Sequence, residues 1–427
     1  MPLSRRAFVA AAAAPLLAQR GAARRPNLLL IVADNLAAHA LGCYGNQEIR
    51  TPNIDLLARG GTRFSLHYSV SPASAAGRAS LLTGLTPRQH GIDDGQAPAR
   101  AAQLPFLHDL LAAAGYVCGF AGHWGLSAPG AAPQGFSFWR PVEDGPAAGF
   151  VSGRITEHAI EFLEQQKPQQ PFFLLASYPE PGNHYRGRPE KYYDLYETAQ
   201  FTTVNWQPAA ANAAEGKEFL DDIVASLRLC AAAITAFDDQ VRALVSAVDK
   251  MGRRDDTLIV LTSCCGHLMG RHGLWGAGRA SNPINMFEES VRTPMIWNWP
   301  LHVPVEGARP EIADSCDLLP ALCEAAGISV PETPARPGRS YLLSALNKPY
   351  PPKNPWRSLT FSHLGDTEMA RDLRYKVVIR NQGQGPNELY DLRRDPGETD
   401  NEFDSGEYVT VAEALARQLA EWRKRYS

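Results

Sequence analysis

The stretch SPASAAGRASLLTG, residues 71–84, combines a hydroxyl nucleophile, a cation and the start of a helix. Ser74 stands four residues ahead of Arg78, and the apolar run at residues 79–82 predicts the first turns of a helix that ends at Gly84. Ser74 would lie just before the helix N-terminus, where unpaired N–H groups and a partial positive charge favour an anionic group. The simpler interpretation is that Ser74 caps the helix and Arg78 faces solvent.

Apolar runs of strand length lie on both sides of this segment. Residues 28–33, 171–178 and 257–262 are continuously apolar or nearly so, which is typical of parallel strands buried on both faces. Amphipathic helices are predicted between them, at residues 104–118 and 219–249. The alternation predicts an α/β three-layer sandwich with a large, mostly parallel sheet flanked by helices.

A proline-rich connector, residues 331–355, separates a smaller C-terminal unit from this domain. We predict a large domain over residues 26–345 and a small α+β subdomain with an antiparallel sheet over residues 346–427. The strands expected in the subdomain lie near residues 358–363, 375–380 and 388–392, and its terminal helix at residues 409–424.

Composition narrows the class of protein. The 427 residues carry a net charge of −3, and no basic bias indicates nucleic-acid binding. Seven cysteines are few and odd in number, which argues against a disulfide scaffold.

Residues 1–25 have the parts of a signal peptide with twin arginines. SRRAF at residues 4–8 precedes an alanine-rich apolar run, residues 9–18, which is too short to span a bilayer. We expect export by the Tat machinery to the periplasm or the extracellular space, cleavage near residues 18–23, and no membrane span afterwards. The alternative is a disordered basic N-terminus.

The order and spacing of several motifs resemble the sulfatase family of the alkaline phosphatase superfamily. These motifs are RPNLLLIVADN at residues 25–35, the Ser74 segment, GRHGLWG at 270–276, EESVRTP at 288–294 and ELYDLRRDPGETDN at 388–401. Ser74 to Arg78 matches the family's S-x-A-x-R variant of the C/S-x-P/A-x-R signature. The resemblance implies a formylglycine made from Ser74 by a maturase, attack of its hydrate on sulfur, and a bound Ca²⁺ or Mg²⁺.

Four positions correspond to the family's metal ligands, and three of them are changed. The family has two aspartates where this chain has Asp34 and Asn35, and an Asp followed by His or Asn where it has Cys264 and Cys265. Asn35 keeps an oxygen but loses a charge, and thiols are soft ligands that suit Ca²⁺ or Mg²⁺ poorly. Zinc binding with Asp34, a vicinal disulfide and plain buried thiols are the alternatives for the two cysteines.

The positions that would hold the sulfate are also altered. His123 and Ala277 stand where the family has lysines, and Gly125 and Gly182 where it has histidines. An imidazole replaces a fixed ammonium poorly. His184, two residues beyond Gly182, is a candidate replacement for the second histidine, or simply a solvated loop residue.

We therefore take Ser74, Arg78 and His123 as the candidate catalytic or binding residues. Loss of a single electrostatic partner typically costs ~10²–10³ in rate. The favoured hypothesis is an exported pseudoenzyme that binds a sulfated saccharide or another small anion. The alternatives are an active sulfuric ester hydrolase that uses Ser74 as formylglycine precursor, and a metal- or redox-responsive protein built on Cys264 and Cys265.

Overall fold

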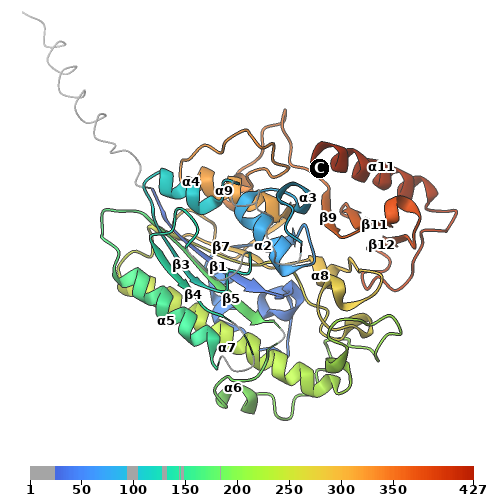
Figure 1. The fold of residues 1–427 in the computed structure, drawn as a ribbon, viewed down its shortest axis with the longest axis horizontal. Coiled ribbons are helices and arrows are strands. Elements are labelled where there is room, and N and C mark those ends of the chain that lie inside the picture. The colour runs from blue at the N-terminus through green and yellow to red at the C-terminus, as the bar shows by residue number, and fades with distance from the viewer. Residues whose placement is uncertain (1–24, 94–103, 127–131, 144, 146–148, 183) are drawn as a thin grey trace, which may run out of the picture.

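A computed structural model describes residues 25–93, 104–126, 132–143, 145, 149–182 and 184–427. The predicted signal peptide therefore lies almost wholly outside the described residues. Two sheets organise the described part of the chain (Figure 1). The main sheet has eight strands in the order β4 (Phe138–Pro141), β3 (Val117–Gly122), β5 (Phe172–Pro181), β1 (Asn27–Asp34), β6 (Thr257–Ser263), β7 (Met295–Asn298), β2 (Thr62–Tyr68) and β8 (Gly307–Asp314).

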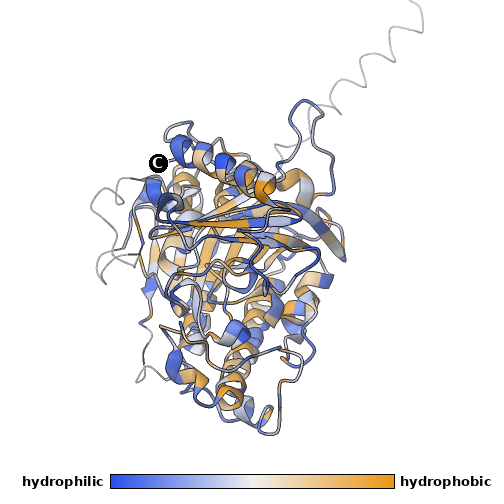
Figure 2. Cartoon of the chain, turned by 90° about the vertical axis from the view of Figure 1, so that its right-hand side faces the viewer, coloured by the Kyte–Doolittle hydropathy of each residue, from blue (hydrophilic) through white to orange (hydrophobic). Residues whose placement is uncertain are grey.

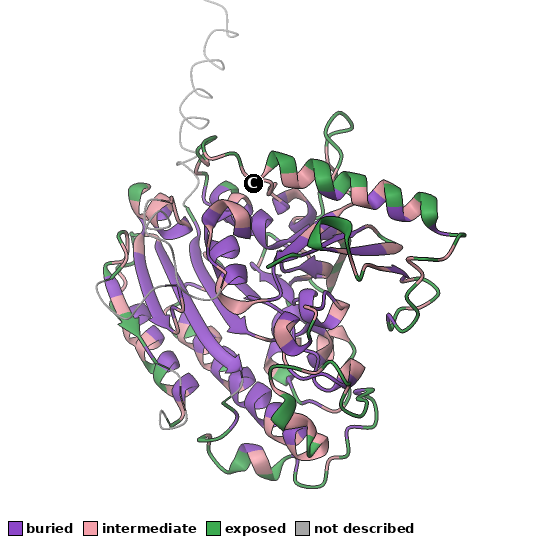
Figure 3. Ribbon diagram, turned by 45° about the vertical axis from the view of Figure 1, so that its right-hand side comes forward, coloured by how far each residue is buried: buried purple, intermediate pink, exposed green. Residues whose placement is uncertain are grey.

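The main sheet is parallel except at one strand. β7 pairs antiparallel with both of its neighbours, β6 and β2, whereas every other pair is parallel. All residues of β1, β5 and β6 are buried, as the purple strands of Figure 3 show. A strand that is covered on both faces needs apolar side chains at nearly every position. This burial explains the continuous apolar runs in the sequence. The predicted fold class is confirmed.

Helices cover both faces of this sheet (Figure 1). Alternate residues of β1 point to opposite faces: Leu29 and Ile31 pack in one apolar cluster with α5 and α7, whereas Leu28 and Leu30 pack in another with α2, α4 and α9. Apolar residues accordingly gather between the layers (Figure 2). The helices are α1 (Pro52–Arg59), α2 (Ser74–Thr83), α3 (Pro87–His90), α4 (Leu107–Ala113), α5 (Val151–Glu164), α6 (Lys191–Asp194), α7 (Ile223–Lys250), α8 (Glu288–Val291), α9 (Leu318–Ala325), α10 (Leu342–Ala345) and α11 (Val409–Arg425).

The second sheet is antiparallel and follows the proline-rich connector. Its strand order is β12 (Glu388–Asp391), β11 (Tyr375–Arg380), β10 (Thr367–Arg371) and β9 (Thr360–Leu364). Leu415 and Leu419 of α11 pack on Ala370 and Val377 of this sheet. The antiparallel sheet and its terminal helix agree with the prediction, but β10 was not foreseen. No helix among the described residues is both long enough and apolar enough to cross a bilayer.

Candidate functional site

The carboxyl ends of four adjacent strands bring the predicted site residues together. β3, β5, β1 and β6 are neighbours in the sheet, and they end at Gly122, Pro181, Asp34 and Ser263. Open α/β sheets carry their sites at this edge because the loops after parallel strands converge there. The edge therefore holds Asp34 and Asn35 beside the loop that starts with Cys264 and beside the loop with His123.

Helix α2 packs directly against the end of β6. A Cβ atom on Gly77 would lie 2.1 Å from the carbonyl oxygen of Cys264, so only glycine permits this approach. Ser74 and Arg78 are one turn apart and so face the strand ends together. The helix begins at Ser74 itself, with Ala73 as its N-cap and no side-chain cap. The expectation that Ser74 lies just before the helix is thus wrong by one residue.

Ser74, Asn35 and Cys265 form a small hydrogen-bonded group. The hydroxyl of Ser74 donates to Oδ1 of Asn35 at 2.9 Å, and the thiol of Cys265 donates to the same oxygen at 2.8 Å. Sγ of Cys265 lies 3.6 Å from Oγ of Ser74. The amide oxygen that would ligate a cation at position 35 therefore already accepts two hydrogen bonds from within the protein.

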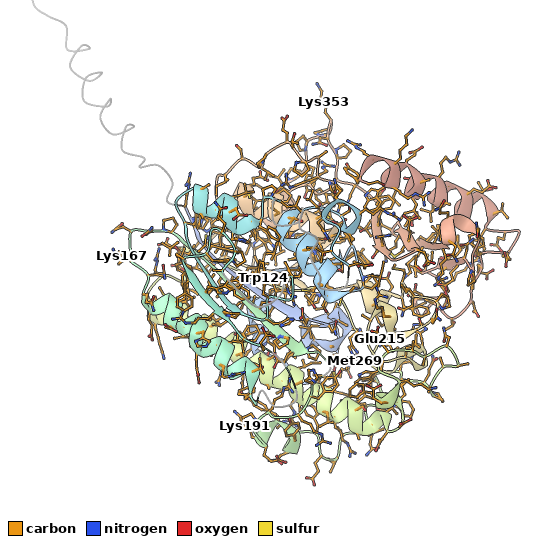
Figure 4. The ribbon with its side chains drawn as sticks, in the orientation of Figure 1. Trp124, Lys167, Lys191, Glu215, Met269 and Lys353 are labelled. Atoms are coloured by element: carbon orange, nitrogen blue, oxygen red, sulfur yellow. The ribbon has the colours of Figure 1, made fainter. Side chains whose placement is uncertain are left out.

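Arg78 forms a buried ion pair with Asp34. Its Nη2 lies 2.5 Å from both carboxylate oxygens, and its Nη1 donates to the carbonyl oxygen of Trp124 at 2.9 Å. Trp124 is labelled in Figure 4. The side chains of Arg78 and Asp34 are only 2% and 9% exposed. Burial alone would lower the pKa of Arg78, but the carboxylate of Asp34 raises it overall, so the guanidinium stays charged.

The two cysteines are buried, free thiols. Burial raises the pKa of Cys265 to about 12 and that of Cys264 well above its ordinary value. Both groups are therefore protonated at neutral pH when no metal ion is bound.

The donor set at the four positions that the resemblance assigns to the family's metal does not fit Ca²⁺ or Mg²⁺. It consists of a carboxylate whose two oxygens face Arg78, an amide oxygen that already accepts two hydrogen bonds, and two neutral thiols. Hard cations require several charged or carbonyl oxygens. Within the described ranges, no group of three or more His, Cys, Asp or Glu side chains is arranged to hold a metal ion.

Gly125 provides the space that Arg78 occupies. Gly125 has a φ of +62°, and a Cβ atom there would lie 2.2 Å from Nη1 of Arg78 and 2.8 Å from Nε2 of His123. A histidine at position 125 would therefore displace the guanidinium from its present position. The absence of a side chain at position 125 and the Arg78–Asp34 pair are thus linked by geometry.

A cavity of about 690 Å³ opens above these residues, and its described lining includes Asn35, Ser74, Arg78 and His123. His184 is exposed and is not part of that lining. The structure thus brings together all three candidate catalytic residues but does not place the proposed replacement histidine with them.

Several lining residues were missed by sequence reasoning. These are Trp275 and three charged residues, namely Asp93, Glu215 (labelled in Figure 4) and Arg279, which lies 3.9 Å from Asp93. The signal for Arg279 was its place two residues after Ala277, the position of a family lysine. Nothing in the sequence marked Glu215, because it comes from a loop before α7 with no recognisable pattern.

Neither site cysteine is expected to react with iodoacetamide in the folded protein at pH 8. At a pKa of about 12, the thiolate fraction of Cys265 is about one part in ten thousand, and Cys265 is also buried. Mass spectrometry after alkylation should find both modified only in guanidinium chloride. The thiol of Cys265 ionises near pH 9 in the unfolded chain and near pH 12 in the folded protein. Its contribution to the free energy of unfolding is therefore complete below pH 9 and is lost as the pH rises from 9 to 12. Fast, selective modification of Cys265 would instead favour a redox-responsive site.

Comparisons with known proteins define the class and then the family. The fold is that of the alkaline phosphatase-like hydrolases, and residues 26–328 match the Sulfatase family while residues 282–425 match "N-sulphoglucosamine sulphohydrolase, C-terminal". The chain belongs to the Sulfatase family.

Two curated relatives illustrate the relationship. The chain is 25% identical to N-acetylglucosamine-6-O-sulfatase of Bacteroides thetaiotaomicron, over 96% of this chain and 88% of the relative. It is 29% identical to human arylsulfatase A, over 90% and 85% of the two chains.

Solved structures share the fold. One is a protein in complex with its substrate D-glucosamine-2-N,6-O-disulfate, with a TM-score of 0.81 and 23% identity over 94% of this chain and 98% of that chain. Another is the phosphonate monoester hydrolase of Agrobacterium radiobacter, with a TM-score of 0.79 and 22% identity over 94% and 96% of the chains.

Proposed function

We propose that this protein is an exported pseudoenzyme of the sulfatase family, which binds a sulfated saccharide or a similar small anion without hydrolysing it. The ion pair between Arg78 and Asp34 carries the proposal. The resemblance implies that the family's residue at the position of Asp34 binds a metal ion. In this protein the carboxylate of Asp34 pairs with the guanidinium of Arg78 instead. Export rests on the twin-arginine sequence at residues 1–25.

Hydrolysis of a sulfate ester needs a nucleophile, neutralisation of the sulfate charge and an acid for the leaving group. This chain keeps Ser74 for the first requirement, but Arg78 is already paired, and positions 125, 182 and 277 carry no ionisable side chain. Because each lost partner typically costs ~10²–10³ in rate, the remaining acceleration would be very small.

Binding makes smaller demands than catalysis. The first turn of α2 has no side-chain cap, and His123 and Arg279 also line the cavity with groups that can donate hydrogen bonds. Millimolar to micromolar affinity requires only about 4–8 kcal/mol. The sugar-specific sulfatase among the relatives supports an amino-sugar sulfate as the first ligand to test.

An active hydrolase is the second candidate, because Ser74 lines the cavity at the start of α2 beside Arg78, where the family places its nucleophile. Intact-protein mass spectrometry separates the two candidates, since conversion of Ser74 to formylglycine removes two hydrogen atoms. The proposal expects an unmodified Ser74 and no turnover of an aryl sulfate.

Thermal unfolding tests whether the protein binds a sulfated sugar. N-acetylglucosamine-6-sulfate should raise the melting temperature, while unsulfated N-acetylglucosamine, the matched control, should raise it less or not at all. No shift with sulfated sugars would remove the binding function. Turnover that disappears in Ser74→Ala would overturn the pseudoenzyme proposal and establish the second candidate.

A further inference from the structure

A second cavity lies between the main sheet and the C-terminal sheet. Its volume is about 220 Å³, and it shares no described lining residue with the Ser74 cavity. His39, from the loop after β1, lines one side, and Arg292, which precedes β7, lines another. Arg371, the last residue of β10, belongs to the C-terminal sheet. Segments of both sheets therefore meet at this cavity.

The carboxylates of this cavity already have cationic partners. Glu289 accepts from Arg271 at 2.8 Å. Glu288 accepts from Arg371 at 3.1 Å and from Lys376 at 3.3 Å. Two of the three lining arginines are thus matched by the two lining glutamates. Lys376 also contacts the buried Glu398 and does not itself line the cavity.

Arg292 is the third arginine. Its charge acts with those of Lys376 and Arg371 to lower the pKa of Glu288, but Arg292 forms no ion pair at contact distance among the described residues. Its Nε donates to the backbone carbonyl oxygen of Ser65 at 3.0 Å. Among the described residues, no carboxylate lies within salt-bridge distance of Arg292, and its terminal nitrogens form no hydrogen bond. A half-buried guanidinium with two unused Nη groups therefore faces the cavity.

His39 adds a polar group but no charge. Burial, followed by the nearby Arg271, lowers the pKa of His39 to about 3, so the imidazole is neutral at physiological pH. Its Nε2 is buried and has no hydrogen-bond partner within the described part of the chain. The lining thus combines an excess positive charge with an unused ring nitrogen.

We infer that this cavity is a binding site for a small oxyanion, held by the Nη groups of Arg292 with Arg271 and Arg371 beside them. Guanidinium groups bind the oxygens of phosphate, sulfate and carboxylate through paired, charge-assisted hydrogen bonds. The volume is below that of ordinary ligand pockets, so the ligand is an inorganic oxyanion or a single acidic group. A bound anion would bridge Arg292 and Arg371 and so stabilise the contact between the two sheets. This inference does not depend on the function proposed for the Ser74 cavity.

Inorganic phosphate is the probe for this site, tested by thermal unfolding and calorimetry against potassium chloride at equal ionic strength. Phosphate at a hundred times its dissociation constant should raise the ratio of folded to unfolded protein about a hundredfold. Arg292→Gln should weaken phosphate binding at least about tenfold, the scale of one lost charge-assisted contact. The control Arg242→Gln, at an exposed arginine on α7, should leave it unchanged. Equal binding by wild type and Arg292→Gln overturns the inference.

Chemical modification provides a second measurement that needs no variant. Phenylglyoxal should modify Arg292 more slowly in phosphate or in glucuronate than in chloride, as followed by mass spectrometry, while Arg242 reacts equally in all three. Protection by phosphate indicates a free inorganic ion as the natural ligand. Protection by glucuronate alone indicates the acidic group of a saccharide. Protection by neither anion overturns the inference.

Discussion

Replacing Asp34 with asparagine is expected to lower the free energy of unfolding by about 3–5 kcal/mol, the range for breaking a buried ion pair. The substitution would leave Arg78 charged and 2% exposed, with only neutral acceptors, the amide oxygen of the new side chain and the carbonyl oxygen of Trp124. Nε of Arg78 already lacks a partner, and no second carboxylate among the described residues forms an ion pair with Arg78, so no other negative charge compensates. Denaturant unfolding at pH 7 measures the loss.

A double variant tests the interaction between Asp34 and Arg78 rather than either residue alone. Asp34→Asn with Arg78→Met should cost clearly less than the sum of the single changes, because it removes both buried charges. Arg140→Gln, which removes an exposed ion pair with Glu161, is the control and should have little effect.

A chelator completes this test. If the ion pair with Arg78 replaces the metal, as we propose, EDTA should leave the unfolding curve of the wild type unchanged. Additive single changes together with EDTA-sensitive stability would contradict the ion-pair account.

Much of the architecture could be predicted because burial on both sides of a parallel strand leaves a direct trace in the sequence. The apolar run at residues 28–33 indicated both the strand and the position of Asp34 and Asn35 at its carboxyl end. β10, TEMAR, was missed because its burial depends on partners: Arg371 and Glu368 are buried only through ion pairs with distant residues. Such pairing has no local pattern.

The site residues could be collected from the sequence, but their mutual contacts could not. Arg78 was predicted as an anion-binding group, and its pairing with Asp34 depends on the missing side chain at Gly125 and on the close approach of Gly77 to Cys264. Both conditions depend on the absence of a Cβ atom, at Gly125 and at Gly77. Glycine in a sequence indicates flexibility more readily than it indicates which neighbour will fill the space.

Restoring the ligands of the family should create a calcium site that the wild type does not have. The variant Asn35→Asp, Cys264→Asp, Cys265→Asn presents three carboxylates and an amide oxygen at the four positions that now hold one carboxylate. Without a cation, three close, buried carboxylates repel one another, so the variant should be less stable than the wild type in EDTA. Calcium at a hundred times its dissociation constant should return about 2.7 kcal/mol.

The control carries asparagine in place of both cysteines and keeps Asn35, so it has similar side-chain volume and none of the new charge. Its unfolding should not respond to calcium. Turnover of an aryl sulfate should remain absent even in the calcium-bound variant, because Gly125, Gly182 and Ala277 still supply no acid or cation. If wild type and variant respond alike to calcium, then Asp34 already ligates a cation in the natural protein. The ion pair with Arg78 would then not be what replaces the metal.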